Sequence, residues 1–229
     1  MSLSRRAFAE FVGTALLLAA VVGSGVMGVR LAQGNDAVAL LANAGATAAA
    51  LYVLIEIFAP VSGAHFNPAV TLAMRLRGGL STRDALAYVA VQVAGAVIGV
   101  LLAHAMFGLV LVQPGVHART GAAQWLSEGV ATFGLLLAIL LGLRHRPRAI
   151  PVLVASWIFA AYWFTASTSF ANPAVTLARG LTQTFAGIRP IDVPAFVIAQ
   201  IGGAVVALGV ASLLDPRPAA NAPRVLQAE

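Results

Sequence analysis

The chain has 229 residues, of which 60% are hydrophobic and only 10% are charged, and it contains no cysteine. A soluble domain carries about 25% charged residues, so this composition excludes an ordinary soluble fold. The net charge of +6 comes without any run of basic residues interleaved with aromatic ones, which argues against a nucleic-acid partner. Because cysteine is absent, neither a disulfide nor a thiol site can form.

Six apolar stretches of about 20 residues follow one another along the chain, and each is long enough for a transmembrane helix. They lie at 7–27, 37–59, 85–107, 122–143, 150–170 and 193–214. The pattern predicts one all-α integral membrane domain over residues 1–214. Residues 215–229 are polar and Pro-rich, and we expect them to form a disordered cytoplasmic tail.

An even number of spans places both ends of the chain on the same side of the membrane. All 14 basic residues are arginines, and ten of them fall on the side of the termini. The other side holds Arg30, Arg119, Arg179 and Arg189. Because cytoplasmic loops carry an excess of basic residues, this distribution predicts that both termini are cytoplasmic.

The seven residues NPAVTLA occur twice, at 67–73 and 172–178, a shift of 172 − 67 = 105 residues. Each copy lies between the second and third spans of one half of the chain. Each half also has a glutamate in its first span, Glu10 or Glu128. Because each half has three spans, the second half (about 122–214) is inverted relative to the first (about 5–107), a plan common in membrane transport proteins.

The apolar stretch at each NPA copy extends over only about ten residues, or about 15 Å of helix, which is half of a bilayer core. We therefore expect six transmembrane helices and two re-entrant half-helices, each with an asparagine cap and a proline in its first turn. The inversion makes the two helix N-termini face each other at the midplane. There they would offer amide donors to neutral solutes and repel cations. The predicted midplane site comprises Asn67, Pro68, Ala69, Asn172, Pro173 and Ala174.

The motifs SGAHFNPAVT and SFANPAVT, together with the paired glutamates, resemble the aquaporin–aquaglyceroporin (major intrinsic protein) family over about residues 5–214. The resemblance implies a passive channel for small neutral solutes such as water and glycerol. It implies no cofactor, no metal and no enzymatic activity. It also implies a homotetramer with one pore per subunit, which for this chain would lie in the lipid bilayer of a bacterial inner membrane.

Typical members of the family have an arginine directly after the second NPA, where this chain has Val175. In this respect it resembles bacterial aquaglyceroporins associated with arsenic resistance, which implies passage of As(OH)₃ and related metalloid hydroxides. The family's spacing, counted without gaps, adds Thr47, Ala160 and Ser169 to a wide and weakly polar outer constriction. Arg179, one turn after Val175, is expected at the outer surface. The alternative is that it folds back and replaces the missing arginine.

Two sets of polar residues leave alternatives open. Glu10 and Glu128 are ionisable groups inside apolar spans, which are functional candidates by default. In the family they support the re-entrant loops, but a proton-coupling role would instead make the protein an ion-coupled secondary transporter. His65, next to the first NPA, would either line the cytoplasmic half of the pore or stabilise its loop. A non-conducting membrane protein would not need two polar re-entrant loops, and no nucleophile–base pair, metal cluster or phosphate loop suggests an enzyme.

Overall fold

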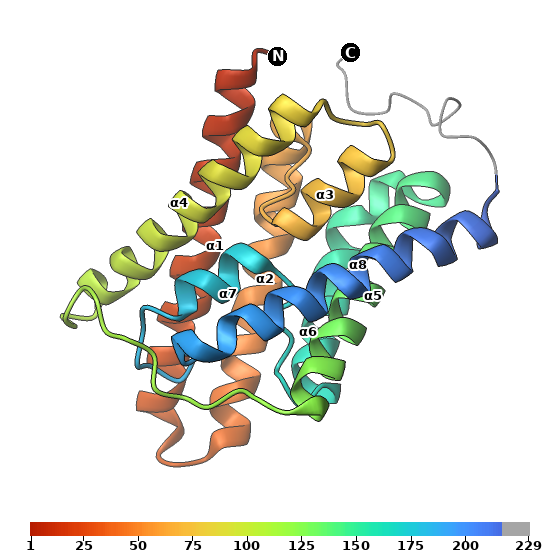
Figure 1. Ribbon diagram of the computed structural model, residues 1–229. Helices are drawn as coiled ribbons and strands as arrows, with labels where there is room; N and C mark the ends of the chain where they lie inside the picture. Colours follow the sequence, from red (N-terminus) through yellow and green to blue (C-terminus); the bar gives the residue numbers. More distant parts are fainter. Residues whose placement is uncertain (217–229) are drawn as a thin grey trace.

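The computed structural model of the protein describes residues 1–216, and in this part of the chain every regular element is a helix (Figure 1). Six long helices are apolar enough to cross a membrane, the last two together with a short 3₁₀ turn at their start. They are α1 (Leu3–Ala32), α2 (Asp36–Ser62), α4 (Thr82–Met106), α5 (Ala122–His145), α6 (Ile150–Phe164, after η1 Pro147–Ala149) and α8 (Val193–Leu214, after η2 Pro190–Asp192). The predicted all-α membrane fold with six spans is confirmed.

One predicted boundary is wrong. The fifth span was expected to reach residue 170, but α6 ends at Phe164 and Thr165 is already extended. Thr168, Ser169 and Ala171 then adopt left-handed backbone angles, with φ of 59°, 51° and 48°. This apolar segment therefore belongs to the approach to the second half-helix and not to the transmembrane helix before it. The tail expected over 215–229 lies outside the described residues, apart from Asp215 and Pro216.

The two half-helices are α3 (Pro68–Leu76) and α7 (Pro173–Arg179), and each begins directly after an asparagine cap. The side-chain oxygen of Asn67 accepts a hydrogen bond from Ala69 N at 2.9 Å, and that of Asn172 accepts one from Ala174 N at 3.0 Å. Both caps have nearly the same backbone angles (φ −154°, ψ 119° and φ −158°, ψ 114°). Each proline occupies the first turn, where its missing N–H leaves no hydrogen bond unmade.

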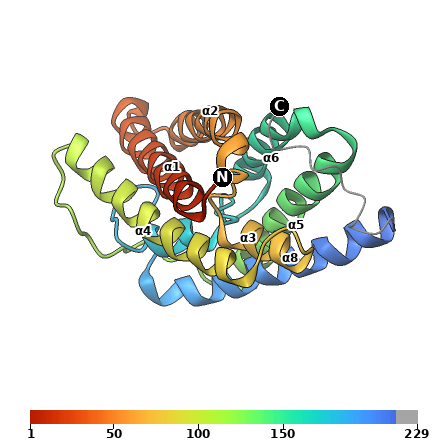
Figure 2. The same cartoon turned by 90° about the horizontal axis from the view of Figure 1, so that it is seen from above.

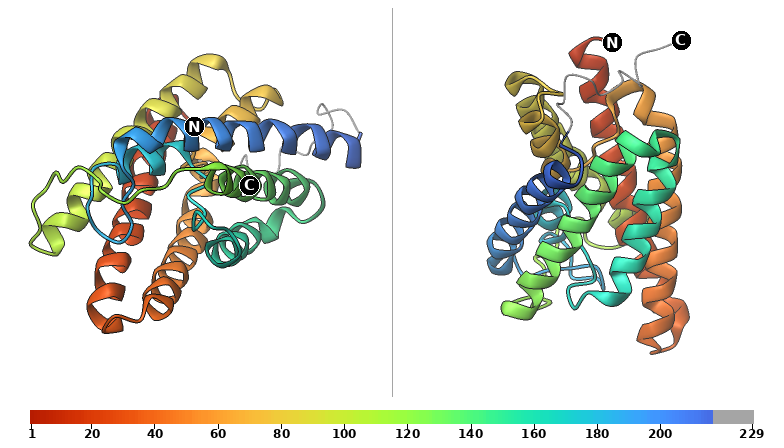
Figure 3. Two further views of the ribbon diagram at one scale, coloured as in Figure 1. Left: turned by 60° about the horizontal axis from the view of Figure 1, so that its bottom comes forward. Right: turned by 90° about the vertical axis from the view of Figure 1, so that its right-hand side faces the viewer.

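The two halves have the same packing. The helices α1, α2, α3 and α4 of the first half correspond to α5, α6, α7 and α8 of the second. α1 packs on α2 and α4, and α5 packs in the same way on α6 and α8. The right-hand view of Figure 3 shows α1, α2, α5 and α6 running side by side. Each half-helix crosses over to the other half, because α3 contacts α8 and α7 contacts α4. Seen from above, α3 lies beside α4 and α8 (Figure 2), and it contacts both of these helices.

Glycines allow the closest helix contacts. On α4, a Cβ at Gly95 would overlap the carbonyl oxygen of Phe11, and one at Gly99 would overlap that of Ala15. On α8, Gly203 lies against the carbonyl oxygen of Gly129 in the same way, whereas Gly202 faces open space. Small residues at such positions let membrane helices approach until their backbones touch.

Because Gly99 lies against the backbone of α1 and Gly202 faces open space, we expect Gly99→Ala to destabilise the protein and Gly202→Ala to have no such effect. At position 99 the added methyl group must displace backbone of α1, which costs about 1–3 kcal/mol by the usual cost of overpacking. The measurement is the midpoint of thermal unfolding in detergent, followed by size-exclusion chromatography of the remaining folded protein. Equal midpoints for the two variants would contradict the packing described here.

Candidate pore and outer constriction

The two asparagine caps hold each other's loops at the centre of the bundle, where α3 and α7 begin (Figure 1). The amide nitrogen of Asn67 donates to the carbonyl oxygen of Ala171 at 2.8 Å, and that of Asn172 donates to Phe66 at 2.8 Å. Each side-chain oxygen is already used to cap its own helix. Since an amide nitrogen carries two N–H groups, one donor on each asparagine is left without a protein partner among these bonds.

The segments before the caps have strained backbones. Ala64 and Phe66 adopt left-handed φ values of 51° and 47°, and Ser169 and Ala171 adopt values of 51° and 48° at the matching positions of the second half. Residues other than glycine rarely adopt such angles, so other interactions must hold them there. The two buried glutamates provide those interactions.

Glu10 is completely buried and accepts hydrogen bonds from four donors. Two are backbone N–H groups, of His65 at 3.0 Å and Phe66 at 2.7 Å. The others are the hydroxyl of Ser62 at 2.6 Å and the side-chain amide of Gln92 at 2.9 Å. The carboxylate thus binds the part of the first loop whose backbone no helix can satisfy.

Glu128 binds the second loop in the same way and is also completely buried. It accepts from the backbone N–H groups of Phe170 and Ala171, both at 2.9 Å, and from the side-chain amide of Gln200 at 2.6 Å. Gln200 also donates to the Thr176 hydroxyl at 2.8 Å. The sequence repeat includes both glutamines, Gln92 and Gln200, but only the structure shows that each links a buried glutamate to the threonine of the adjacent half-helix.

His65 is half-buried at the start of the first re-entrant segment. Its Nδ1 lies 3.1 Å from the hydroxyl of Thr71, and its ring packs edge-on against Tyr88. Within residues 1–216 no hydrogen-bond partner is present at Nε2, and this atom is not among the fully enclosed polar atoms. One ring nitrogen therefore stabilises the loop, while the other remains available to solvent.

The four residues expected in the outer constriction do not all come together. Thr47, Ser169 and Val175 are buried, but Ala160 lies exposed on α6, next to the exposed Phe159. The hydroxyl of Tyr162 instead lies 3.3 Å from that of Thr47. Counting without gaps therefore led to the wrong face of α6, and Tyr162, two residues further on, points into the bundle. Its inward orientation is seen in its burial and in its contact with Thr47, and could not be read from the family's spacing.

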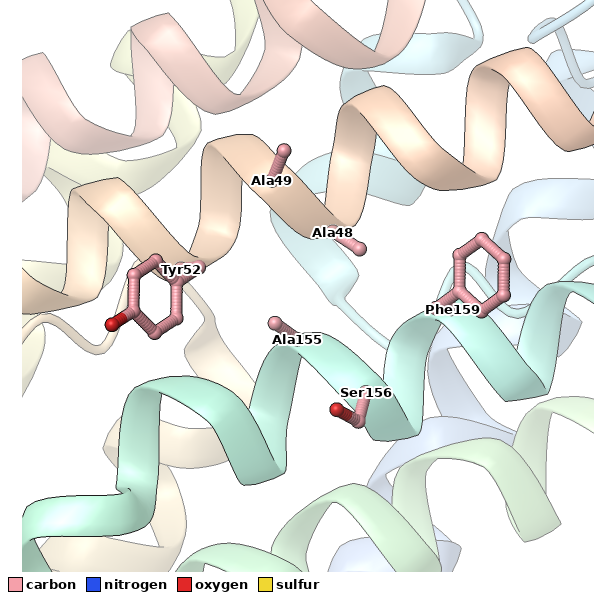
Figure 4. A pocket seen from close by; sticks show the side chains of 6 residues that line it. All are labelled: Ala48, Ala49, Tyr52, Ala155, Ser156 and Phe159. Atoms are coloured by element: carbon pink, nitrogen blue, oxygen red, sulfur yellow. The ribbon is translucent and has the colours of Figure 1, made fainter.

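The exposed face of α6 forms a hollow with α2, of about 330 Å³, that is separate from the asparagine pair (Figure 4). Its lining is mostly small and apolar and comes from two helices only. The lining residues are Ala48, Ala49, Tyr52, Ala155, Ser156 and Phe159. Because it contains neither a charged group nor a residue of the half-helices, it does not form part of the pore site.

Arg179 does not lie at the outer surface, so that expectation is wrong. Only 2% of the residue is exposed, and its Nε donates to the carbonyl oxygen of Ala186. The guanidinium carbon lies 3.3 Å from the centroid of the Phe170 ring. The side chain folds back into the protein because an aromatic ring and a loop carbonyl are available to it there.

Six apolar spans, an inverted repeat and two opposed half-helices capped at one central point define a multi-pass membrane channel. The model of the major intrinsic protein family matches residues 1–152. The chain belongs to this family, that of the aquaporins and aquaglyceroporins, and is therefore a channel protein and not an enzyme.

Relatives and a solved structure support the same assignment. The chain is 59% identical to Aquaglyceroporin AqpS of Rhizobium meliloti (strain 1021) over 215 residues, which cover 93% of this chain and 92% of the relative. It is 31% identical to Probable aquaporin AqpM of Archaeoglobus fulgidus, covering 90% of this chain and 95% of that protein. The X-ray structure of the aquaglyceroporin from Plasmodium falciparum has the same fold, with a TM-score of 0.75 at 17% identity, covering 94% of this chain and 98% of that one.

The reciprocal bonds predict that Asn67→Ala and Asn172→Ala are not additive. Either change removes a helix cap worth about 0.5–2 kcal/mol and frees one loop carbonyl of the opposite half. Since both changes weaken one junction, the double variant should lose less unfolding free energy than the sum of the single losses. Unfolding in detergent measures this coupling, and strictly additive losses would show that the two caps act independently.

Proposed function

We propose that the protein is a passive channel for small neutral solutes, namely water, glycerol and trivalent arsenic or related metalloid hydroxides. The observation that carries this proposal is the asparagine pair, which leaves one amide N–H on each side chain at the point where the half-helices meet. A solute with oxygen acceptors can replace its water hydrogen bonds with these donors as it passes.

The same site would exclude cations and protons. Two helix N-termini, each carrying a partial positive charge, converge there and raise the energy of a cation. Water that directs its oxygen toward Asn67 and Asn172 has its hydrogens turned away on both sides, so a proton cannot pass along a continuous chain of hydrogen bonds. Pro68, Ala69, Pro173 and Ala174 complete the two first turns and support this geometry.

The glutamates favour a channel over an ion-coupled carrier. The carboxylate oxygens of Glu10 and Glu128 already accept several hydrogen bonds. Two of the donors to each carboxylate are backbone N–H groups. A proton added to either carboxylate would displace a donor that the re-entrant loop cannot satisfy elsewhere. We therefore assign both residues to loop support, and we place His65 on the cytoplasmic side of the pore.

For the outer constriction we propose Thr47, Tyr162, Ser169 and Val175. Val175 offers no donor, and its volume is much smaller than that of an arginine. The relative named Aquaglyceroporin AqpS supports glycerol as a solute. As(OH)₃ is likewise neutral and carries three hydroxyl groups, so a ring that admits glycerol fits it by size and polarity.

We place the channel in the inner membrane of a bacterium with both termini cytoplasmic, and we expect a homotetramer as in the family. The arginine distribution supports this orientation. The burial of Arg179 strengthens it, because one arginine on the opposite side is not a surface residue. Residues 1–214 would form the complete membrane domain of each subunit.

Transport should be passive. Flux of glycerol into proteoliposomes is expected without any ion gradient and without saturation at low millimolar concentration, because a pore does not change conformation for each solute. Glu10→Gln should lower stability by about 1–3 kcal/mol, the cost of unsatisfied buried donors, without altering the gradient independence. Glu56→Gln, the same change at an exposed position of α2, serves as the control. A strict requirement for a proton or sodium gradient would favour the carrier instead.

The solute range should depend on Val175. Val175→Arg adds bulk and five donors to the constriction. It is expected to reduce the passage of glycerol and As(OH)₃ more than that of water, in stopped-flow swelling and uptake assays. Val175→Leu adds bulk without charge and separates the two effects. If a well-folded Val175→Arg protein keeps the wild-type solute profile, Val175 does not line the constriction.

A further inference from the structure

A second arginine lies at the outer end of the second half-helix, and it comes from a distant part of the chain. Arg119 belongs to the connection between α4 and α5 and is half-buried. Its Nε donates to the carbonyl oxygen of Gly187 at 2.9 Å, and its Nη1 donates to that of Ser167 at 3.0 Å. Its backbone N–H donates to Asp192 at 2.9 Å. The connection is thus fastened to the segments on both sides of α7.

Arg119 and Arg179 contact the same aromatic ring. Their guanidinium carbons lie 4.9 Å and 3.3 Å from the centroid of Phe170. The ring itself is fixed, because the Phe170 backbone N–H is bound to Glu128 and the ring packs edge-on against Phe196. Cation–π attraction favours each guanidinium, but it also brings two like charges together.

Neither guanidinium forms a direct ion pair with a carboxylate in the described part of the chain. The ion pairs of arginine there involve Arg6, Arg144 and Arg189. Buried charges are normally paired, because desolvation is costly. The pKa of the nearby His117 is lowered, first by burial and then by the charges of Arg119 and Arg179.

The unused donors show where the charges point. Within residues 1–216, neither terminal nitrogen of Arg179 donates a hydrogen bond, nor does Nη2 of Arg119. None of these three nitrogens is among the enclosed polar atoms that lack a partner, so each can contact solvent. For a side chain in a residue only 2% exposed, such as Arg179, that solvent must occupy a narrow space. Arg179 is also on the face of α7 that carries Val175, about 6 Å further along the helix.

We propose that Arg119 and Arg179, held on Phe170, form a cationic filter at the outer mouth of the pore. They would take the place of the arginine that typical members of the family have at the position of Val175. The filter donates hydrogen bonds to neutral solutes with oxygen acceptors and repels small cations before they reach the midplane. This inference rests on the proposed channel function and adds two specificity-determining residues to it.

The absence of cysteine allows a direct test, because a single introduced thiol can be modified selectively. Arg119→Cys is compared in proteoliposomes with Arg30→Cys before and after reaction with cationic and neutral methanethiosulfonates. Arg30 is a matched control, because it is exposed on the same side and its guanidinium carbon lies 5.0 Å from the ring of Phe107. Urea and guanidinium, which are similar in size and differ by one charge, are the probes.

The expected result is a rise in the guanidinium-to-urea permeability ratio of about tenfold for Arg119→Cys, consistent with the loss of a unit charge a few ångströms from the path. The cationic reagent should reverse this rise because it restores a positive charge, whereas the neutral reagent should leave the permeability ratio raised. Arg30→Cys should behave like the wild type throughout. Arg119→Gln, which keeps an N–H donor for the loop carbonyls, should give the same rise and shows that misfolding is not the cause.

Three outcomes would contradict the proposals, and they can be distinguished from one another. If the wild type passes urea but Arg119→Cys matches Arg30→Cys before and after modification, Arg119 does not face the path and the filter is wrong. The filter is also wrong if the neutral and cationic reagents have the same effect on the permeability ratio. If the wild type passes neither urea nor glycerol, the channel function itself fails.

Discussion

A backbone inside a bilayer must have its polar groups satisfied, and this requirement governs the two extended segments before Asn67 and Asn172. Helices satisfy their own N–H and carbonyl groups, but these segments cannot. The buried glutamates Glu10 and Glu128 solve the problem, since each accepts two successive backbone N–H groups of one segment. The polar re-entrant loops can therefore exist only because each half carries one charged residue deep in its first helix.

The glutamates also connect the parts of each half to one another. Glu10 on α1 binds Gln92 on α4, and Gln92 in turn binds Thr71 on α3, so three helices share one buried network. Glu128, Gln200 and Thr176 form the same network in the second half. Buried polar networks that are well satisfied favour a single arrangement of the surrounding helices. The position of each half-helix is thus determined by the whole three-helix unit around it.

The sequence predicts the architecture well and the outer constriction poorly, for physical reasons. The spans follow from hydrophobicity, and the half-helices follow from a repeated cap and proline, which act on neighbouring residues. The outer constriction depends on distant contacts. Counting back from Asn172 without gaps gave Ala160, but the residue of α6 that reaches Thr47 is Tyr162, and the gap-free count cannot show how many residues separate α6 from the second half-helix. Nothing local in the sequence indicates that Arg119 and Arg179 meet at one phenylalanine, since Arg119 comes from a loop without a regular pattern.

The reciprocal bonds of the two asparagines have a consequence for motion. Carriers with inverted repeats alternate by rocking one repeat against the other around a central site. In this protein the centre of such a movement is where Asn67 holds Ala171 and Asn172 holds Phe66, so rocking would break both bonds at once. The two repeats therefore behave as one rigid frame. Any opening or closing of the path would have to come from side chains and loops at its ends.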